Sequence, residues 1–251
     1  MPEPSILTFD TPEAAADACA DRILDSLNQT RRDRGQAAIA LSGGSTPRLM
    51  FQHMAKSGFD WSNIHIFQVD ERCVPPDDAL SNFRMMREAL PDTARIEEKQ
   101  VHRIRGESTR DDAAGLYVDE IGRSFHLSAG ELPVFDVIAR RMGRTRIRPA
   151  SFPESPWSAI AAESRRRCLW RNRNRRRIES RTLCLAAGGE KAEAIRRVLR
   201  GPFDPVETPA QIVSPDTVWY ISTKAQGLYC ELGRTLPLVA ALKGFGYERL
   251  R

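Results

Sequence analysis

Short apolar runs alternate with longer segments of mixed polarity along this chain. Five of these runs have the length and apolarity of buried strands, and they cover residues 37–41, 64–69, 134–138, 183–187 and 218–222. Four further segments carry helix signals, over residues 12–28, 47–54, 83–90 and 190–199. Strands that alternate with helices predict a parallel sheet with helices on both faces. We therefore expect an α/β fold with an open, mostly parallel sheet, in a single domain over residues 1–251.

Local signals mark the starts of three of these helices. Thr11 is a suitable N-cap, and Pro12 suits the first helical position that follows it. Pro47 is predicted to open the second helix in the same way, and Ser81 with Asn82 is predicted to cap the third.

Ligands of open parallel sheets bind beyond the carboxyl ends of the strands. Three strand ends of the predicted sheet are therefore candidate sites. They are Ser42–Thr46, Asp70–Arg72 and the segment that follows Ile138.

The Ser42–Thr46 loop joins a predicted strand to a predicted helix and reads Ser-Gly-Gly-Ser-Thr. Glycines let the backbone approach an anion, hydroxyl groups donate hydrogen bonds, and a helix N-terminus directs N–H groups toward a phosphate. The same residues also suit a simple tight turn. The spacing alone leaves both interpretations open, a phosphate cradle and a turn.

The other two motifs each have a functional and a structural interpretation. Asp70, Glu71 and Arg72 end a strand, where arginine can grip phosphate or carboxylate with paired donors; the alternative is a solvated turn with a surface ion pair. Lys191 stands near a predicted helix N-terminus, where its charge opposes the helix dipole. It therefore faces an anionic ligand or is simply exposed.

The charge of the chain is unevenly distributed. The net charge is +5 overall, but the segment from Arg140 to Arg181 holds 14 Arg and 3 Glu and so carries +11. The remainder is therefore acidic, and the whole-chain charge does not indicate a nucleic-acid partner. The arginine-rich segment itself could be a basic binding patch, a solvated insert or an aberrant stretch.

The remaining composition excludes several classes. Five dispersed cysteines without a C-x-x-C pair and four histidines without ligand spacing predict no disulfide framework and no metal site. No apolar run is long enough to span a membrane, and the N-terminus lacks the features of a signal peptide. We expect a cytoplasmic monomer without membrane contact.

Read together, the motifs resemble the 6-phosphogluconolactonase family, with glucosamine-6-phosphate deaminase as a more distant relative of the same fold. The resemblance covers residues 6–138 and 182–228 and rests on L-S-G-G-S-T-P, V-D-E-R-C-V-P-P-D-D-A-L-S-N-F, A-A-G-G-E-K-A-E-A-I-R-R-V-L and the Pro209–Gln211 tripeptide. It implies hydrolysis of 6-phosphoglucono-δ-lactone without metal or cofactor. A histidine would activate water, and an aspartate would orient that histidine. Arg72 and Lys191 would bind anionic parts of the substrate or transition state. The substrate-binding residues implied are Ser42, Gly43, Gly44, Ser45, Thr46, Asp70 and Asn82.

The chain departs from the family pattern at its catalytic centre. The family's third strand runs into G-M-G-x-D-x-H-x-A-S-L-F-P-G, and the matching stretch here is R-M-G-R-T-R-I-R-P-A-S-F-P, residues 141–153. The aspartate and the histidine are absent, and no histidine follows His126. Loss of an acid–base group lowers a rate by roughly 10²–10⁴-fold, so we expect sharply reduced activity. The open alternatives are a non-catalytic sugar-phosphate binder and a deaminase/isomerase-like enzyme.

A reading-frame shift over about residues 139–181 would explain this departure. Permitted codons for Gly143–Trp157, read two bases later, encode P-D-A-H-T-A-S-L-F-P-G-E-P-L, which restores the family motif. The frame returns near Thr182, and residues 230–251 also lack resemblance to the family. We therefore treat 139–181 as an aberrant segment and 230–251 as a tail of uncertain origin.

Overall fold

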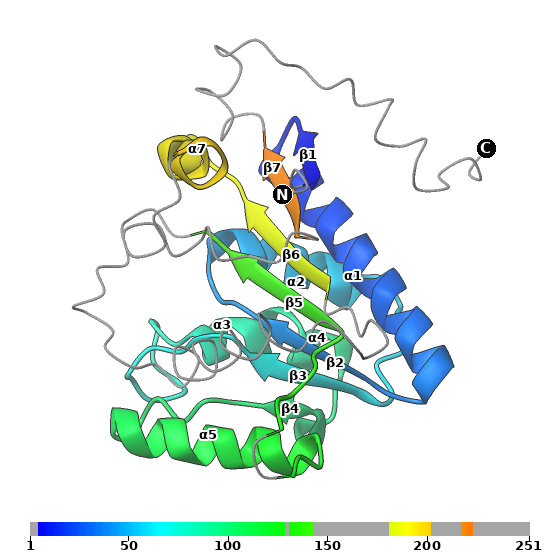
Figure 1. Ribbon diagram of the computed structural model, residues 1–251, viewed down its shortest axis with the longest axis vertical. Coiled ribbons are helices and arrows are strands. Elements are labelled where there is room, and N and C mark those ends of the chain that lie inside the picture. The colour runs from blue at the N-terminus through cyan, green and yellow to red at the C-terminus, as the bar shows by residue number, and fades with distance from the viewer. Residues whose placement is uncertain (1–4, 129–130, 143–180, 202–216, 223–251) are drawn as a thin grey trace.

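A seven-stranded parallel sheet forms the centre of the protein (Figure 1). The computed structural model describes residues 5–128, 131–142, 181–201 and 217–222. The strand order is β1-β7-β6-β5-β2-β3-β4, and every pair is parallel. The strands are β1 (Ser5–Phe9), β2 (Ala37–Leu41), β3 (Ile64–Gln68), β4 (Val101–His102), β5 (Val137–Arg141), β6 (Arg181–Ala186) and β7 (Val218–Ser222). The predicted fold class is confirmed.

Helices cover both faces of the sheet. They are α1 (Pro12–Arg34), α2 (Ser45–Lys56), α3 (Asn82–Ala89), α4 (Pro91–Ala94), α5 (Arg110–Ser124) and α7 (Ala192–Arg200), with 3₁₀ turns η1 (Glu98–Gln100) and η3 (Gly189–Lys191). The largest apolar cluster joins α1, α2 and α3 to alternate residues of β2, β3, β5, β6 and β7. Two smaller clusters join α5 and α7 to the other face. This alternation is what a strand buried on two sides produces.

The strand order reverses between β2 and β5, which are neighbours in space. From β2 the chain adds β3 and β4 on one side, and from β5 it adds β6 and β7 on the other. Leu41 pairs with Ala139 at the carboxyl end of this central pair. Open sheets of this kind bind ligands at the point where the winding reverses, so a ligand site is expected beyond the carboxyl ends of β2 and β5.

The predicted N-caps Thr11 and Ser81 are confirmed, but the predicted bounds of all four helices differ from the observed ones. Thr11 Oγ1 accepts from Ala14 N at 3.0 Å, and Ser81 Oγ accepts from Arg84 N at 3.1 Å. Helix α2 begins at Ser45 rather than at Pro47.

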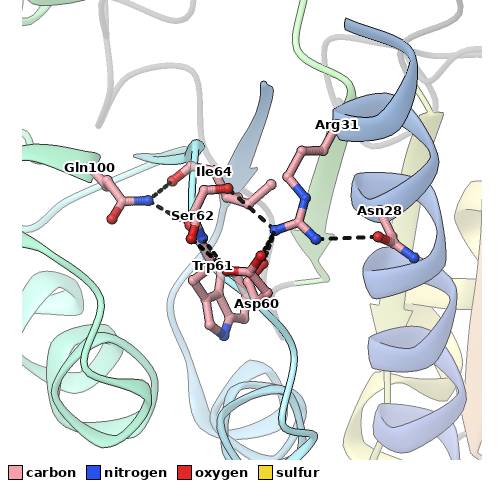
Figure 2. A network of polar contacts seen from close by, with 7 residues as sticks. All are labelled: Asn28, Arg31, Asp60, Trp61, Ser62, Ile64 and Gln100. Carbon is pink, nitrogen blue, oxygen red and sulfur yellow. Dashed lines mark hydrogen bonds and ion pairs between the residues drawn. The ribbon is translucent and has the colours of Figure 1, made fainter. Parts of the chain in front are cut away.

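Helix α1 does not end at Asn28 but continues to Arg34, where Gly35 takes a left-handed conformation with φ 78°. These last turns are polar, and they are held by tertiary contacts that periodicity does not reveal. Arg31 pairs with the carboxylate of Asp60 at 2.9 Å and also donates to Asn28 Oδ1 (Figure 2).

The third strand also differs from the prediction, because it covers residues 137–141 instead of 134–138. Asp136 occupies the position before it, where its carboxylate accepts the N–H of Ala38 at 2.8 Å. At the other end, Arg140 and Arg141 pair with Cys184 and Leu185 of β6. The first two residues of the arginine-rich segment are therefore part of the sheet.

Smaller differences concern the other elements. Strand β3 ends one residue early, β6 begins at Arg181, and the helix predicted over 190–199 is split into η3 and α7. The sequence patterns missed β1, β4, α4 and α5. Within the described ranges, no helix is long and apolar enough to cross a membrane, and no cluster of potential metal ligands occurs.

Candidate functional site

The Ser42–Thr46 loop lies at the reversal point of the sheet. Ser42 is buried, and its N–H donates to the carbonyl of Ala139 in β5 at 3.0 Å. The loop leads directly into α2, a helix of 12 residues whose first N–H groups have no partner within the helix. It therefore combines a fixed position on the central strands with N–H donors and a favourable dipole for an anion.

Both glycines of the loop are required by their surroundings. Gly44 has φ 128°, which favours glycine over any residue with a Cβ. Gly43 lies against Asn82, since a Cβ added there would stand 2.3 Å from Asn82 Oδ1. These constraints mean that the two glycines have structural reasons for their identity, beside any ligand they admit.

Lys191 reaches the loop from η3, beyond the end of β6. Its Nζ donates to Thr46 Oγ1 at 3.1 Å, and the side chain is buried, with 8 % exposure. The alternative of an exposed lysine was wrong. A buried ammonium is costly to desolvate, and here it lies against a loop suited to anions. The fold thus joins two predicted site residues that are 145 positions apart.

Asp70 and Asn82 form a second polar pair beside the loop. Asn82 Nδ2 donates to the carbonyl oxygen of Asp70 at 3.1 Å and to its Oδ2 at 3.2 Å. Burial raises the pKa of Asp70 above the usual value of 3.8, against the opposing effect of Arg141 and Arg72. Asn82 links both parts of the site, because its amide holds Asp70 while its oxygen lies over Gly43.

Glu71 organises this region, and sequence reasoning did not assign it a role. Its Oε1 accepts from Asn82 N at 2.7 Å, and its Oε2 accepts from Phe83 N at 2.8 Å. Oε2 also accepts from Gln68 Nε2 and from Ser81 Oγ. One carboxylate thus satisfies the N-terminal donors of α3 and fixes the strand end to that helix. A solvated turn, the structural alternative, does not describe this residue.

Two arginines flank Asp70. Arg72 is exposed at the start of the loop after β3, and Arg141 lies at the end of β5, with its Nη2 3.9 Å from Asp70 Oδ2. Sequence reasoning selected Arg72 and treated Arg141 as part of the aberrant segment. Strand alternation would have revealed Arg141, since it shares a face with Val137 and Ala139 once the strand is correctly placed.

The four histidines of the chain all lie in the described part, and three of them have side-chain partners outside this site. His53, in the last turn of α2, contacts Asp17 and Asp21 of α1 at 3.0 and 2.8 Å. His65 and His102 bond each other at 3.0 Å, and His102 also contacts Glu120. His126 follows the C-terminal end of α5.

Several sequence predictions concern residues outside the described ranges. Residues 143–180, which include most of the arginine-rich segment, lie outside the described residues, as do Pro209–Gln211 and the tail over 230–251. The described site is therefore a loop suited to an anion, with a buried lysine against it, next to a carboxylate, an amide and two guanidinium groups. Such a set can bind a phosphorylated, hydroxyl-bearing ligand and stabilise negative charge that develops on it.

Comparison with known proteins agrees with this arrangement. Residues 10–221 match the family described as glucosamine-6-phosphate isomerases/6-phosphogluconolactonase. The chain is 30% identical over 205 residues to 6-phosphogluconolactonase of Synechocystis, which covers 77% of this chain and 85% of the relative. It is 29% identical over 236 residues to the Haemophilus influenzae protein of the same name, and this match covers 87% of this chain and 97% of the relative. The solved 6-phosphogluconolactonase from Trypanosoma cruzi shares the fold, with a TM-score of 0.68 and 20% identity. The match covers 90% of this chain and 96% of the solved one.

Proposed function

Because the chain belongs to the glucosamine-6-phosphate isomerase/6-phosphogluconolactonase family, we propose that it binds 6-phosphoglucono-δ-lactone and hydrolyses it to 6-phosphogluconate. This is a step of the oxidative pentose phosphate pathway. The observation that carries the proposal is the contact of the buried Lys191 ammonium with Thr46 in the loop at the sheet's reversal point. Relatives that extend over most of this chain bear the name of that activity.

The proposed roles follow from the site. The Ser42–Thr46 loop and Lys191 hold the phosphate of the substrate, and the sugar ring extends toward Asp70 and Asn82. Water adds to the lactone carbonyl and gives up a proton to the solvent, and the carbonyl oxygen becomes an oxyanion. The oxyanion then reforms the C=O bond, the ring C–O bond breaks, and the ring oxygen takes up a proton. The guanidinium group of Arg72 stabilises the negative charge of the oxyanion. No metal or cofactor is required by this proposal.

Turnover is proposed to be slow. The aspartate and histidine of the family pattern are absent from residues 143–153, and His53, His65 and His102 have other partners. Activation of water by a positioned base contributes roughly 10²–10⁴-fold. The phosphate-binding part of the site does not depend on that base. We therefore expect the chain to keep its affinity for the sugar phosphate while its rate of hydrolysis is low.

Two measurements test the function together. The first is hydrolysis of the lactone by the purified chain, corrected for the spontaneous rate. The second is calorimetric titration with 6-phosphogluconate. Binding with slow turnover is expected. Turnover at the rate of a related lactonase would show that another group acts as the base, and absence of binding would refute the assignment.

A non-catalytic sugar-phosphate binder is the second candidate, favoured by the missing base. It is distinguished by binding without any acceleration of hydrolysis. A deaminase/isomerase-like activity is tested by turnover of glucosamine 6-phosphate. We further propose that the protein acts as a cytoplasmic monomer, which sedimentation and fractionation would test.

The reading-frame shift is a separate proposal. Strands β5 and β6 pair in register on either side of residues 143–180, which supports a return of the original frame near Thr182. A single-base insertion or deletion near each end of codons 139–182 is expected in the gene. A related gene that encodes the same arginines in frame would overturn this explanation.

A further inference from the structure

Arg141 is the last residue of β5, at the carboxyl end of the central strand pair. Its side chain points to the face that Val137 and Ala139 share, toward the start of α2. The stem lies against the bare Cα of Gly44, because a Cβ added there would meet Arg141 Cδ at 2.8 Å and Nε at 3.4 Å. A guanidinium group therefore lies beside the loop that is proposed to hold the phosphate.

The ion pair with Asp70 leaves donor capacity on Arg141. The Nη2 to Oδ2 distance of 3.9 Å exceeds a hydrogen bond, for which N···O distances are about 2.7–3.2 Å. Among the described residues, Asp70 is the acidic group within ion-pair distance of Arg141. The side chain is 29% exposed, which places the charge between solvent and the protein interior. A second anion can approach this guanidinium without displacing a hydrogen bond to Asp70.

Lys191 approaches the same loop from the neighbouring strand. Strands β5 and β6 pair along their length, with Arg141 opposite Leu185, and Lys191 follows β6 to reach Thr46. Two cations on adjacent strands thus border one short loop, Arg141 beside Gly44 and Lys191 beside Thr46. This is the arrangement expected around a dianionic group, since a phosphate offers several acceptor oxygens to converging donors.

We propose that Arg141 is a second phosphate-binding cation of this site, and that it sets the preference of the site for phosphorylated over unphosphorylated sugar acids. The inference rests on the proposed function for the identity of the ligand. It concerns the folded chain, and it holds whichever way codons 139–182 came to encode arginine. Arg141 binds the ligand in this proposal and takes no part in breaking bonds.

The test is calorimetric titration of the full chain and three variants. Arg141→Met removes the charge and keeps the apolar stem, Arg141→Lys keeps a point charge, and Arg140→Met removes the same charge one position earlier. Arg140 lies in the same strand, on the opposite face and exposed, so it is a matched control for long-range electrostatics. The ligands are 6-phosphogluconate, glucitol 6-phosphate and gluconate. Thermal unfolding of each variant shows that the fold is retained.

Arg141→Met is expected to weaken binding of both phosphorylated ligands by about 10- to 100-fold, the effect of losing a charge-assisted contact. Arg141→Lys should fall between wild type and Arg141→Met, because it cannot reproduce paired donors. Arg140→Met should change little. Binding of gluconate should be equally weak in all four proteins.

Three results would overturn the proposal. Arg141→Met could bind 6-phosphogluconate as wild type does, or lose no more affinity than Arg140→Met. It could instead lose affinity for 6-phosphogluconate and gluconate while glucitol 6-phosphate binding is unchanged, which would assign Arg141 to the carboxylate. A wild-type chain that binds none of these ligands refutes the proposed function as well, whereas binding without turnover leaves the role of Arg141 supported.

Discussion

Replacing Glu71 with alanine is expected to destabilise the fold and the site together. The carboxylate accepts the N–H groups of Asn82 and Phe83 at 2.7 and 2.8 Å, and both groups belong to the first turn of α3, where no intrahelical acceptor is available. Each hydrogen bond to a charged acceptor contributes about 1.5–3 kcal/mol. Water can replace part of this in a partly exposed loop, so we expect a loss of about 3 kcal/mol in the free energy of unfolding.

The loss should be visible in Tm as well as in chemical denaturation. For a chain of this size, 1 kcal/mol lowers Tm by about 2–4 °C, so Glu71→Ala is expected to lower it by about 6–12 °C. Glu71→Gln keeps one acceptor oxygen and should fall between the two proteins. Urea unfolding followed by far-UV circular dichroism gives the free energy, and calorimetry gives Tm.

Glu88→Ala is the matched control. Glu88 lies in α3, the helix that Glu71 caps, and it pairs with Arg84 at 2.9 Å. Both side chains are 42% exposed, and exposed ion pairs contribute little to stability. If Glu71→Ala is no less stable than Glu88→Ala, the carboxylate does not cap α3 and the reasoning fails. Because Asn82 holds Asp70, Glu71→Ala is also expected to weaken ligand binding.

The remaining predictions concern the loop and the groups around it. Lys191→Met is expected to weaken binding of 6-phosphogluconate, measured by calorimetry, by about 10- to 100-fold, because the ammonium group of Lys191 is buried against the loop. The control Lys99→Met changes an exposed side chain and should bind as wild type does. Equal affinities in the two variants would contradict the assignment. Gly44→Ala is expected to destabilise the chain in urea by about 1–3 kcal/mol, because φ is 128° and the new Cβ would meet an arginine stem at 2.8 Å. Gly115→Ala, in α5 with nothing within 4 Å of the added Cβ, should instead stabilise by about 0.5–1 kcal/mol, and a loss there equal to that of Gly44→Ala would point to a general effect of the added methyl group. Asp70 has a raised pKa in the folded state, so its ionisation opposes folding: stability from this group is lost as the pH rises from 3.8 through the folded value. Asp70→Asn should therefore gain stability relative to wild type across that interval and keep a constant advantage above it, and Tm curves that stay parallel from pH 3 to 7 would show that its pKa is not raised.

Several features of the fold could be predicted from local sequence patterns alone. The N-cap at Thr11 and the proline after it were predictable because capping depends on residues three or four positions apart. The strands over 37–41 and 218–222 were predicted at their observed bounds, since both are mostly apolar and the sequence that follows each of them is polar or rich in glycine. The Ser42–Thr46 loop was recognisable for a related reason, as its strand–turn–helix context is contained in one continuous segment.

What the sequence by itself determined is most of the strands and helices, the parallel α/β class and the motifs at the strand ends, because periodicity, capping and turn chemistry act between near neighbours. Only the tertiary structure decided the partners of those motifs. It decided that Lys191 is buried against Thr46, that Glu71 caps α3, and that Arg141 belongs to β5. These contacts depend on strand register and on the order of strands in the sheet, which bring residues together across long stretches of chain and leave no periodic signal in the sequence.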